Sequence, residues 1–79
     1  MSVKIKVLCF GRISETVKTS CLIKEVSDLN RLISELEEEF PDIKKLKYQI
    51  SVNRNIIKSR DYKFSENDEV ALLPPFAGG

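Results

Sequence analysis

One segment of this sequence has a long helical repeat, and it constrains the fold more than any other feature. Its apolar residues recur at intervals of three and four positions and comprise Leu29, Leu32, Ile33, Leu36 and Phe40. Such a repeat gives a helix one apolar stripe, which must pack against another apolar surface. Because the chain has 79 residues, one domain with one small core has to supply that surface. We therefore expect one helix to cover one face of a sheet.

The ends of this helix are marked by residues with known capping preferences. Ser27 is expected as the N-cap, and Asp28 falls in the first turn, where a negative charge suits the helix dipole. Pro41 ends the helix, because the residue before a proline avoids the helical region. The acidic run of Glu35 and Glu37 to Glu39 is either a solvated face or a docking patch for a basic partner.

The segments before the helix alternate as strands do. In residues 3–10, the side chains of Val3, Ile5, Val7 and Cys9 share one face, and those of Lys4, Lys6, Leu8 and Phe10 share the other. Gly11 breaks this strand, and residues 12–18 form a short helix or a loop. Residues 19–25 read as a second strand, with Cys21 and Ile23 directed inward.

Further strands are predicted after the helix. A lysine-rich connector leads to a strand at residues 48–53, on which Ile50 and Val52 point the same way. Residues 53–55 form a turn, since asparagine tolerates left-handed dihedral angles, and Ile56 begins a short return strand. After a second turn at 65–68, residues 69–73 make the last strand, with Val70 and Leu72 toward the helix.

This order predicts an α+β fold with a mixed sheet of four to five strands and one main helix packed on one face. Ubiquitin-like β-grasp domains have the same order of elements, with the first and last strands as parallel central neighbours. Ferredoxin-like and other small α+β folds remain possible from the order alone.

Composition excludes several classes of function. Thirteen basic residues balance twelve acidic ones, so a nucleic-acid partner is not expected. No apolar run approaches a membrane span or a secretory signal, which predicts a cytoplasmic protein without membrane contact. The absence of histidine removes imidazole-based catalysis, and two cysteines without histidine cannot complete a usual zinc site. Cys9 and Cys21 are expected to be free thiols.

The alternation of side chains between the two faces of each strand, which we call parity, also predicts a binding surface. If the first and last strands pair, Leu8, Phe10, Ala71 and Leu73 lie together on the sheet face opposite the helix. They would cluster where the chain leaves the sheet, which is typical of a protein-binding patch. The alternative is a set of scattered apolar surface residues, which are common singly.

The chain ends with PPFAGG, expected as an extended tail at residues 74–79 of a single domain spanning 1–79. Two prolines stop the strand, and Gly78 and Gly79 have no side chains, so this end could enter a narrow channel. The one reactive group here is the α-carboxylate of Gly79, which must be activated before acyl transfer. The tail therefore predicts a carrier or a tag whose partner supplies ATP; a frayed, functionless terminus is the alternative.

The stretch NDEVALLPPFAGG, together with VKIKVLCFGRISE, resembles the small subunits of molybdopterin synthase, which are ubiquitin-like sulfur carriers. The resemblance implies that an E1-like adenylyltransferase adenylates Gly79, which then carries sulfur as a thiocarboxylate. It implies that Gly78, Ala77 and Phe76 thread into the large synthase subunit, where sulfur is delivered to a pterin precursor. Positions matching the family's docking residues are Phe10, Ile56 and Leu73, to which the parity argument adds Leu8.

The same resemblance implies a chain that is not an enzyme by itself and binds no cofactor, but serves as the sulfur-donor subunit of a heterotetramer. Other functions start from the same acyl-adenylate: a sulfur carrier for thiamine or for transfer-RNA thiolation, and a ubiquitin-like protein modifier. A plain interaction module with an irrelevant tail is a further class. A [2Fe–2S] carrier is excluded because two cysteines are too few.

Overall fold

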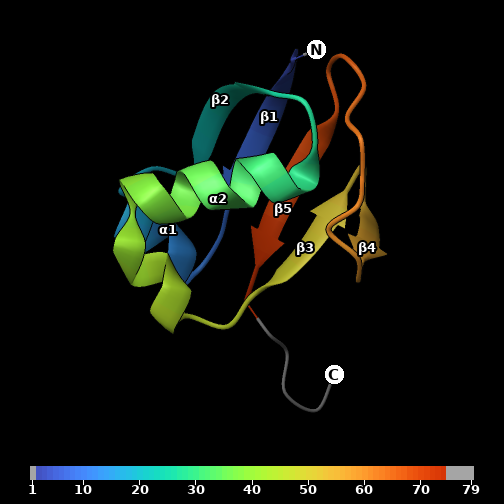
Figure 1. The fold of residues 1–79 in the computed structure, drawn as a ribbon. Helices are drawn as coiled ribbons and strands as arrows, with labels where there is room; N and C mark the ends of the chain where they lie inside the picture. Colours follow the sequence, from blue (N-terminus) through green and yellow to red (C-terminus); the bar gives the residue numbers. More distant parts are fainter. Residues whose placement is uncertain (1, 75–79) are drawn as a thin grey trace.

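The computed structural model describes residues 2–74, shown in Figure 1. The elements are, in chain order, β1 (Val3–Cys9), α1 (Arg12–Val17), β2 (Cys21–Val26), α2 (Leu29–Glu39), the 3-10 helix η1 (Pro41–Lys45), β3 (Gln49–Val52), β4 (Asn55–Ile57) and β5 (Glu69–Leu73). Among the described residues, no helix is long and apolar enough to cross a bilayer.

The five strands form one mixed sheet in the order β2-β1-β5-β3-β4. The first and last strands are central neighbours and run parallel, whereas the other three pairs are antiparallel. Helix α2 crosses one face of this sheet (Figure 1). The predicted α+β fold, with one main helix on a mixed sheet, is confirmed.

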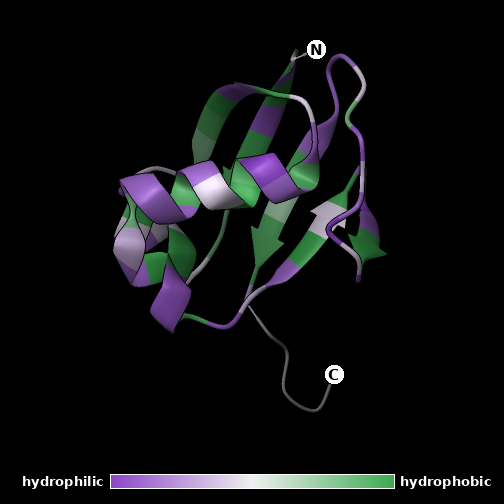
Figure 2. Cartoon of the chain, in the orientation of Figure 1, coloured by the Kyte–Doolittle hydropathy of each residue, from purple (hydrophilic) through white to green (hydrophobic). Residues whose placement is uncertain are grey.

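The core lies between α2 and the sheet. The predicted apolar stripe faces inward, with Leu29, Leu32, Ile33 and Leu36 fully buried and Phe40 partly buried at the end of the helix. Val70 and Leu72 of the central strand are also fully buried beneath it, as parity predicted. Figure 2 shows hydrophobic segments, in green, on α2 and on the strands behind it.

The helix begins one residue later than predicted. Its N-cap is Asp28, whose Oδ1 accepts a hydrogen bond from the Arg31 backbone N–H at 2.8 Å. Ser27 was the expected cap, but its backbone carbonyl accepts from the Phe64 N–H at 3.1 Å. That contact ties residue 27 to the loop before β5, and the next carboxylate takes the capping position.

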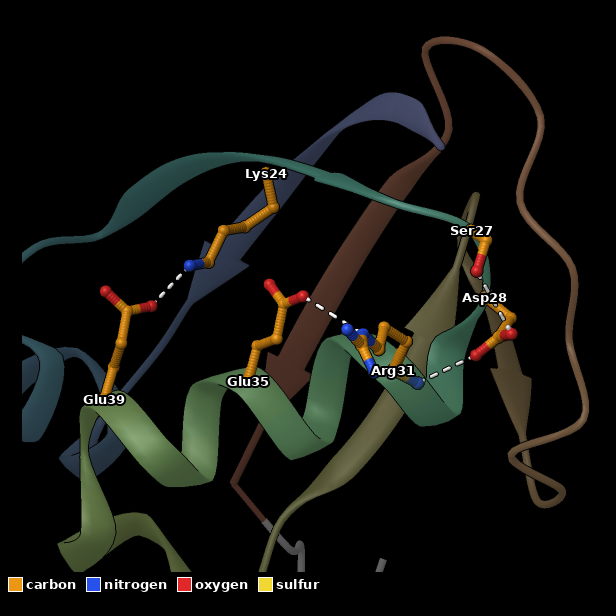
Figure 3. A network of polar contacts seen from close by, with 6 residues as sticks. All are labelled: Lys24, Ser27, Asp28, Arg31, Glu35 and Glu39. Carbon is orange, nitrogen blue, oxygen red and sulfur yellow. Dashed lines mark hydrogen bonds and ion pairs between the residues drawn. The ribbon is translucent and has the colours of Figure 1, made fainter. Parts of the chain in front are cut away.

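The acidic end of α2 forms ion pairs, seen at close range in Figure 3. Glu39 pairs with Lys24 of β2, and Glu35 pairs with Arg31 one turn earlier at 3.4 Å. Two carboxylates of the acidic run are therefore occupied within the chain. This arrangement supports the interpretation of the run as a solvated helix face.

The orientation of β2 differs from the prediction. Cys21 and Ile23 were expected to point inward, but both are exposed, and Ile23 is 57% accessible. Pairing decides the faces: Val7 on β1 is opposite Leu22, whereas Leu8 is opposite Cys21. Because Val7 is fully buried, Leu22 shares the core side and Cys21 is turned to the open side.

One connection is more ordered than the sequence indicated, and a second one is as predicted. The lysine-rich connector contains η1, which buries Ile43 completely against the end of the core. The expected turn between β3 and β4 is confirmed: Asn53 and Arg54 both have positive φ, of 50° and 72°. This is the type I′ geometry whose twist matches a two-residue hairpin.

A polar network joins this hairpin to the start of β5. Asp68 is buried, with 7% of the residue exposed. Its carboxylate accepts hydrogen bonds from the Asn53 side-chain amide at 3.0 Å and from the Ser65 N–H at 2.8 Å. Asn53 in turn accepts from the Glu69 N–H at 3.0 Å and donates its own N–H to the Glu69 carbonyl at 2.7 Å. These bonds fix β5 against β3.

Candidate functional site: the open sheet face and the root of the tail

Among residues 2–74, no helix covers the sheet face opposite α2, and we call this face the open face (Figure 1). Strand pairing lines up one residue from each strand across it: Cys21, Leu8, Ala71, Ser51 and Ile56. Side chains of residues that pair in this way lie on the same side of a sheet. Leu8 and Ile56, two of the predicted docking residues, therefore lie on one face.

The other two predicted docking residues lie at the edge of the open face from which the tail leaves. Leu73 pairs with Gln49 at the end of β5 and is half-buried. Phe10 follows β1, and its N–H donates to the Leu72 carbonyl at 3.3 Å, which extends the ladder by one residue. The Phe10 side chain remains 43% exposed.

The parallel pairing of β1 and β5 explains why these residues meet. Parallel strands end at the same edge of a sheet, so the end of β1, the turn at Gly11 and the end of β5 are neighbours. Pro74 lies against that turn, because a Cβ placed on Gly11 would be 3.4 Å from Cγ of the proline ring. The apolar surface and the beginning of the tail therefore share one location.

The predicted reactive and threading residues lie outside the described part of the chain. Phe76, Ala77, Gly78 and Gly79 follow the last described residue, Pro74. Their assigned roles in activation and threading stay predictions.

Sequence reasoning missed part of the open face. Ile23 is the most exposed large apolar residue among those described, at 57%, followed by Ile56 at 51%. Ile23 lies on the edge strand β2, opposite Lys6. The lysines at positions 4 and 6 on the paired strand were the available signal, since open-face residues of β1 must pair with open-face residues of β2.

The two thiols have opposite environments. Cys9 lies on the core side and is buried, whereas Cys21 is exposed on the open face. Burial raises the pKa of the Cys9 thiol, with a further upward contribution from Cys21. Within residues 2–74 no group of three potential metal ligands comes together. The described open face is therefore an apolar surface with a buried, protonated thiol beneath it.

Comparison with known proteins places this geometry in a family. Residues 7–79 match the sequence profile of the ThiS family. The chain belongs to the ThiS family. The match covers all the strands except the first four residues of β1, and it includes the C-terminal glycines.

A relative within the curated proteins supports the resemblance drawn from the motifs. The molybdopterin synthase sulfur carrier subunit of Dictyostelium discoideum is 34% identical over 86 residues, covering the full length of both chains. The resemblance to small subunits of molybdopterin synthase is thereby confirmed.

Solved structures of similar proteins share the fold of this ThiS-family chain. Small archaeal modifier protein 1 of Methanosarcina acetivorans has a TM-score of 0.84 at 20% identity, covering 100% of this chain and 99% of its own. The putative molybdopterin converting factor subunit 1 of Pyrococcus furiosus has a TM-score of 0.87 at 24% identity, covering 95% and 100%. These likenesses confirm the ubiquitin-like β-grasp.

A third solved structure is a complex. It contains subunits 1 and 2 of the molybdopterin-converting factor from Helicobacter pylori 26695, and the similar chain has a TM-score of 0.76 at 25% identity, covering 98% of this chain and 100% of that one. A protein of this fold thus assembles with a second subunit in that organism.

Proposed function

We propose that this protein is the sulfur carrier and small subunit of a molybdopterin synthase. The observation that carries the proposal is the full-length, 34% identical relative that is itself a molybdopterin synthase sulfur carrier subunit. The apolar open face beside the root of the tail supports it, because a partner that receives the tail would also contact that face.

The chemistry of the proposal takes place at the carboxylate of Gly79. An E1-like enzyme transfers AMP from ATP to this carboxylate and releases pyrophosphate, which gives an acyl-adenylate. Sulfur at the oxidation level of hydrosulfide, supplied by other proteins, then attacks the acyl carbon and displaces AMP, which leaves a thiocarboxylate. In the large subunit, the sulfur bonds to a carbon of the pterin precursor as an oxygen substituent leaves that carbon. Water then cleaves the acyl–sulfur bond, which restores the carboxylate and regenerates the carrier. ATP is bound by the activating partner, and the carrier contributes the reacting terminus without catalysing a step.

Residues of the sheet and of the C-terminal segment have a place in this cycle. The sheet holds Phe10 and Leu73 at the tail root, where they would dock the partner, and Leu8 and Ile56 extend the surface across the sheet. Gly78 and Ala77 would pass through a channel that admits little more than backbone. Two copies of each subunit would form the heterotetramer.

Intact-mass measurement of the protein purified from its own cells tests the proposal. We expect a fraction in which one terminal oxygen is replaced by sulfur, and loss of that fraction when the activating enzyme is deleted. A variant lacking Gly79 should fold normally but fail to support molybdopterin synthesis with the large subunit. If immunoblots instead show a ladder of conjugates and no thiocarboxylate, the protein is a modifier and the proposal is wrong.

A further inference from the structure

Charge is divided unevenly along this chain, although its total is close to zero. Residues 44–63 contain seven of the thirteen basic residues and one of the twelve acidic residues, which gives this segment a net charge of +6. The remaining residues carry a net charge of −5. The basic segment comprises the end of η1, the β3–β4 hairpin and the loop after it. Such a separation produces a local field that steers an oppositely charged partner.

Four of these cations surround a groove beside the edge strand β4. Two adjoining hollows, of about 330 and 270 Å³, share Tyr48, Ile50 and Arg60 in their lining. Lys58 lines the first hollow, and Lys44 and Lys47 line the second. We call this continuous surface the basic groove.

The cations of the basic groove are not neutralised by the chain. Lys44, Lys47, Lys58 and Arg60 have no ion pair within residues 2–74, where the ion pairs involve Lys24, Arg31 and Lys45. One carboxylate, that of Glu37, lines the second hollow. The groove therefore keeps an excess of positive charge available to a partner.

A buried hydroxyl in the same groove also lacks a partner. The Tyr48 hydroxyl oxygen is buried and makes no hydrogen bond to any described residue. Buried polar atoms are satisfied in the great majority of cases, so this hydroxyl is an unused hydrogen-bond donor at the lining of the groove. Burial raises the pKa of this phenol, with Glu37 raising it further and Arg60 lowering it, and the hydroxyl therefore remains a hydrogen-bond donor at neutral pH.

The groove is continuous with the open face and the root of the tail. Ile56 lines the first hollow and also belongs to the row of residues across the open face. Leu73, the last residue of β5, pairs with Gln49, which follows Tyr48 directly and lines the same hollow. A protein that contacts Leu73 and takes the tail would therefore pass close to the groove.

We propose that the basic groove is an extension of the docking surface, and that it binds a carboxylate-rich segment of the large synthase subunit. The proposal rests on the proposed function and specifies how that partner is recognised. Lys47, Lys58 and Arg60 would contact the carboxylates, the Tyr48 hydroxyl would donate to one of them, and Ile56 would pack against an apolar neighbour. An apolar floor with a charged margin is the usual anatomy of a protein interface, whereas a small inorganic anion could use the charges but not the floor.

The test compares two variants that change net charge equally. Lys47→Glu/Arg60→Glu places two negative charges in the groove, and Lys18→Glu/Arg31→Glu places two on exposed sites outside it; each shifts the net charge from +1 to −3. Association with the purified large subunit from the same organism is measured by stopped flow at low and high salt. We expect the groove variant to bind about tenfold more slowly at low salt, with the difference shrinking as salt screens the charges. The control variant should stay within about threefold of the wild type.

Tyr48→Phe supplies a second measurement that is independent of net charge. The variant removes the orphaned hydroxyl and should fold as stably as the wild type, because no bond within the described chain is lost. We expect faster dissociation from the large subunit, by about threefold to tenfold, with an unchanged association rate.

Equal binding by the groove and control variants would overturn the groove proposal while leaving the sulfur-carrier function intact. A groove-variant defect that persists unchanged at high salt would overturn it too, since screening must reduce an electrostatic contact. Failure of the wild-type chain to bind the large subunit at all would overturn both the groove and the proposed function.

Discussion

Gly11 and Pro74 are close neighbours, although they belong to opposite ends of the chain. A Cβ on Gly11 would sit 3.4 Å from the proline Cγ, and the glycine has φ +59° and ψ −135°. This backbone conformation is open to glycine and strained for other residues. The turn after β1 is thus shaped to let the chain leave β5 directly past it.

Substitution of Gly11 by alanine tests this relationship. We expect a loss of about 1–3 kcal/mol in the free energy of unfolding, because alanine is strained at this φ and meets the proline ring closely. Urea denaturation measures the loss as a lower midpoint with an unchanged slope. Ser20→Ala, at an exposed site, is the control and should change stability by less than about 0.5 kcal/mol. An unaltered midpoint for the Gly11 variant would contradict the inference.

The network between Asn53 and Asp68 predicts a coupled loss of stability. Asp68→Ala removes two hydrogen bonds from a largely buried site and should cost about 1–3 kcal/mol. A double-mutant cycle with Asn53→Ala should show that the two losses do not add, since both variants break the same contact. The matched control is Glu66→Ala, whose carboxylate makes one long, exposed bond to the Lys4 N–H at 3.3 Å. Strict additivity would show that the two residues act separately.

Charged substitution on the open face should separate binding from folding. Phe10→Glu replaces a side chain that is 43% exposed, so we expect stability to change by less than about 0.5 kcal/mol. Affinity for the large subunit should fall about tenfold to a hundredfold, as at an aromatic hot spot. Titration calorimetry and urea denaturation give the two quantities. A variant that unfolds, or that binds normally, would remove Phe10 from the docking surface.

The core side of the same sheet should respond in the opposite way. Leu72→Ala removes a fully buried side chain and should lower the free energy of unfolding by about 2–5 kcal/mol. Because Leu72 does not reach the open face, affinity measured under folding conditions should stay close to that of the wild type. A large loss of affinity by a folded Leu72 variant would show that the two faces are not independent.

The two cysteines should differ in reactivity. Cys21 is exposed and should react with iodoacetamide in the native protein, whereas Cys9 is 2% exposed and should react after unfolding. A Cys21→Ser variant should therefore stay unlabelled under native conditions, and a Cys9→Ser variant should be labelled; mass spectrometry distinguishes them.

Cys9 also contributes to the pH dependence of stability. Burial raises its pKa in the folded state, so the unfolded chain ionises first as pH rises. The stability contributed by the protonated thiol is full below the usual thiol pKa and is lost as pH rises through the higher folded value. Between the usual thiol pKa and the higher folded-state pKa, we expect the free energy of unfolding to fall less steeply with pH in Cys9→Ala than in the wild type. Equal slopes would contradict the assignment.

The sequence by itself determined the helix, most of the strands and the motif at the tail. The apolar stripe from Leu29 to Phe40 is consistent with one buried face of the helix, and the alternation around Val70 and Leu72 with one buried side of the last strand. Those patterns depend on the spacing of apolar residues within one segment, so they can be recognised wherever polar and apolar positions alternate clearly. The ending PPFAGG indicated the family because the motif is likewise contained in one short segment.

Tertiary structure decided the features that depend on which segments meet. In β2, apolar side chains lie at both odd and even positions, so the sequence does not show which set faces the core. The pairing of Val7 with Leu22 places Leu22 on the core side and leaves Cys21 and Ile23 exposed. The helix cap moved to Asp28 because Ser27 is held by Phe64, 37 positions away in the chain. The charge of the basic groove is legible in the sequence as the stretch 44–63, but the fold had to bring Lys44 and Lys47 close to Lys58 and Arg60 around one surface. The spacing of apolar residues within a segment determines the two faces of a helix or strand, whereas contacts between distant segments determine which elements are its neighbours.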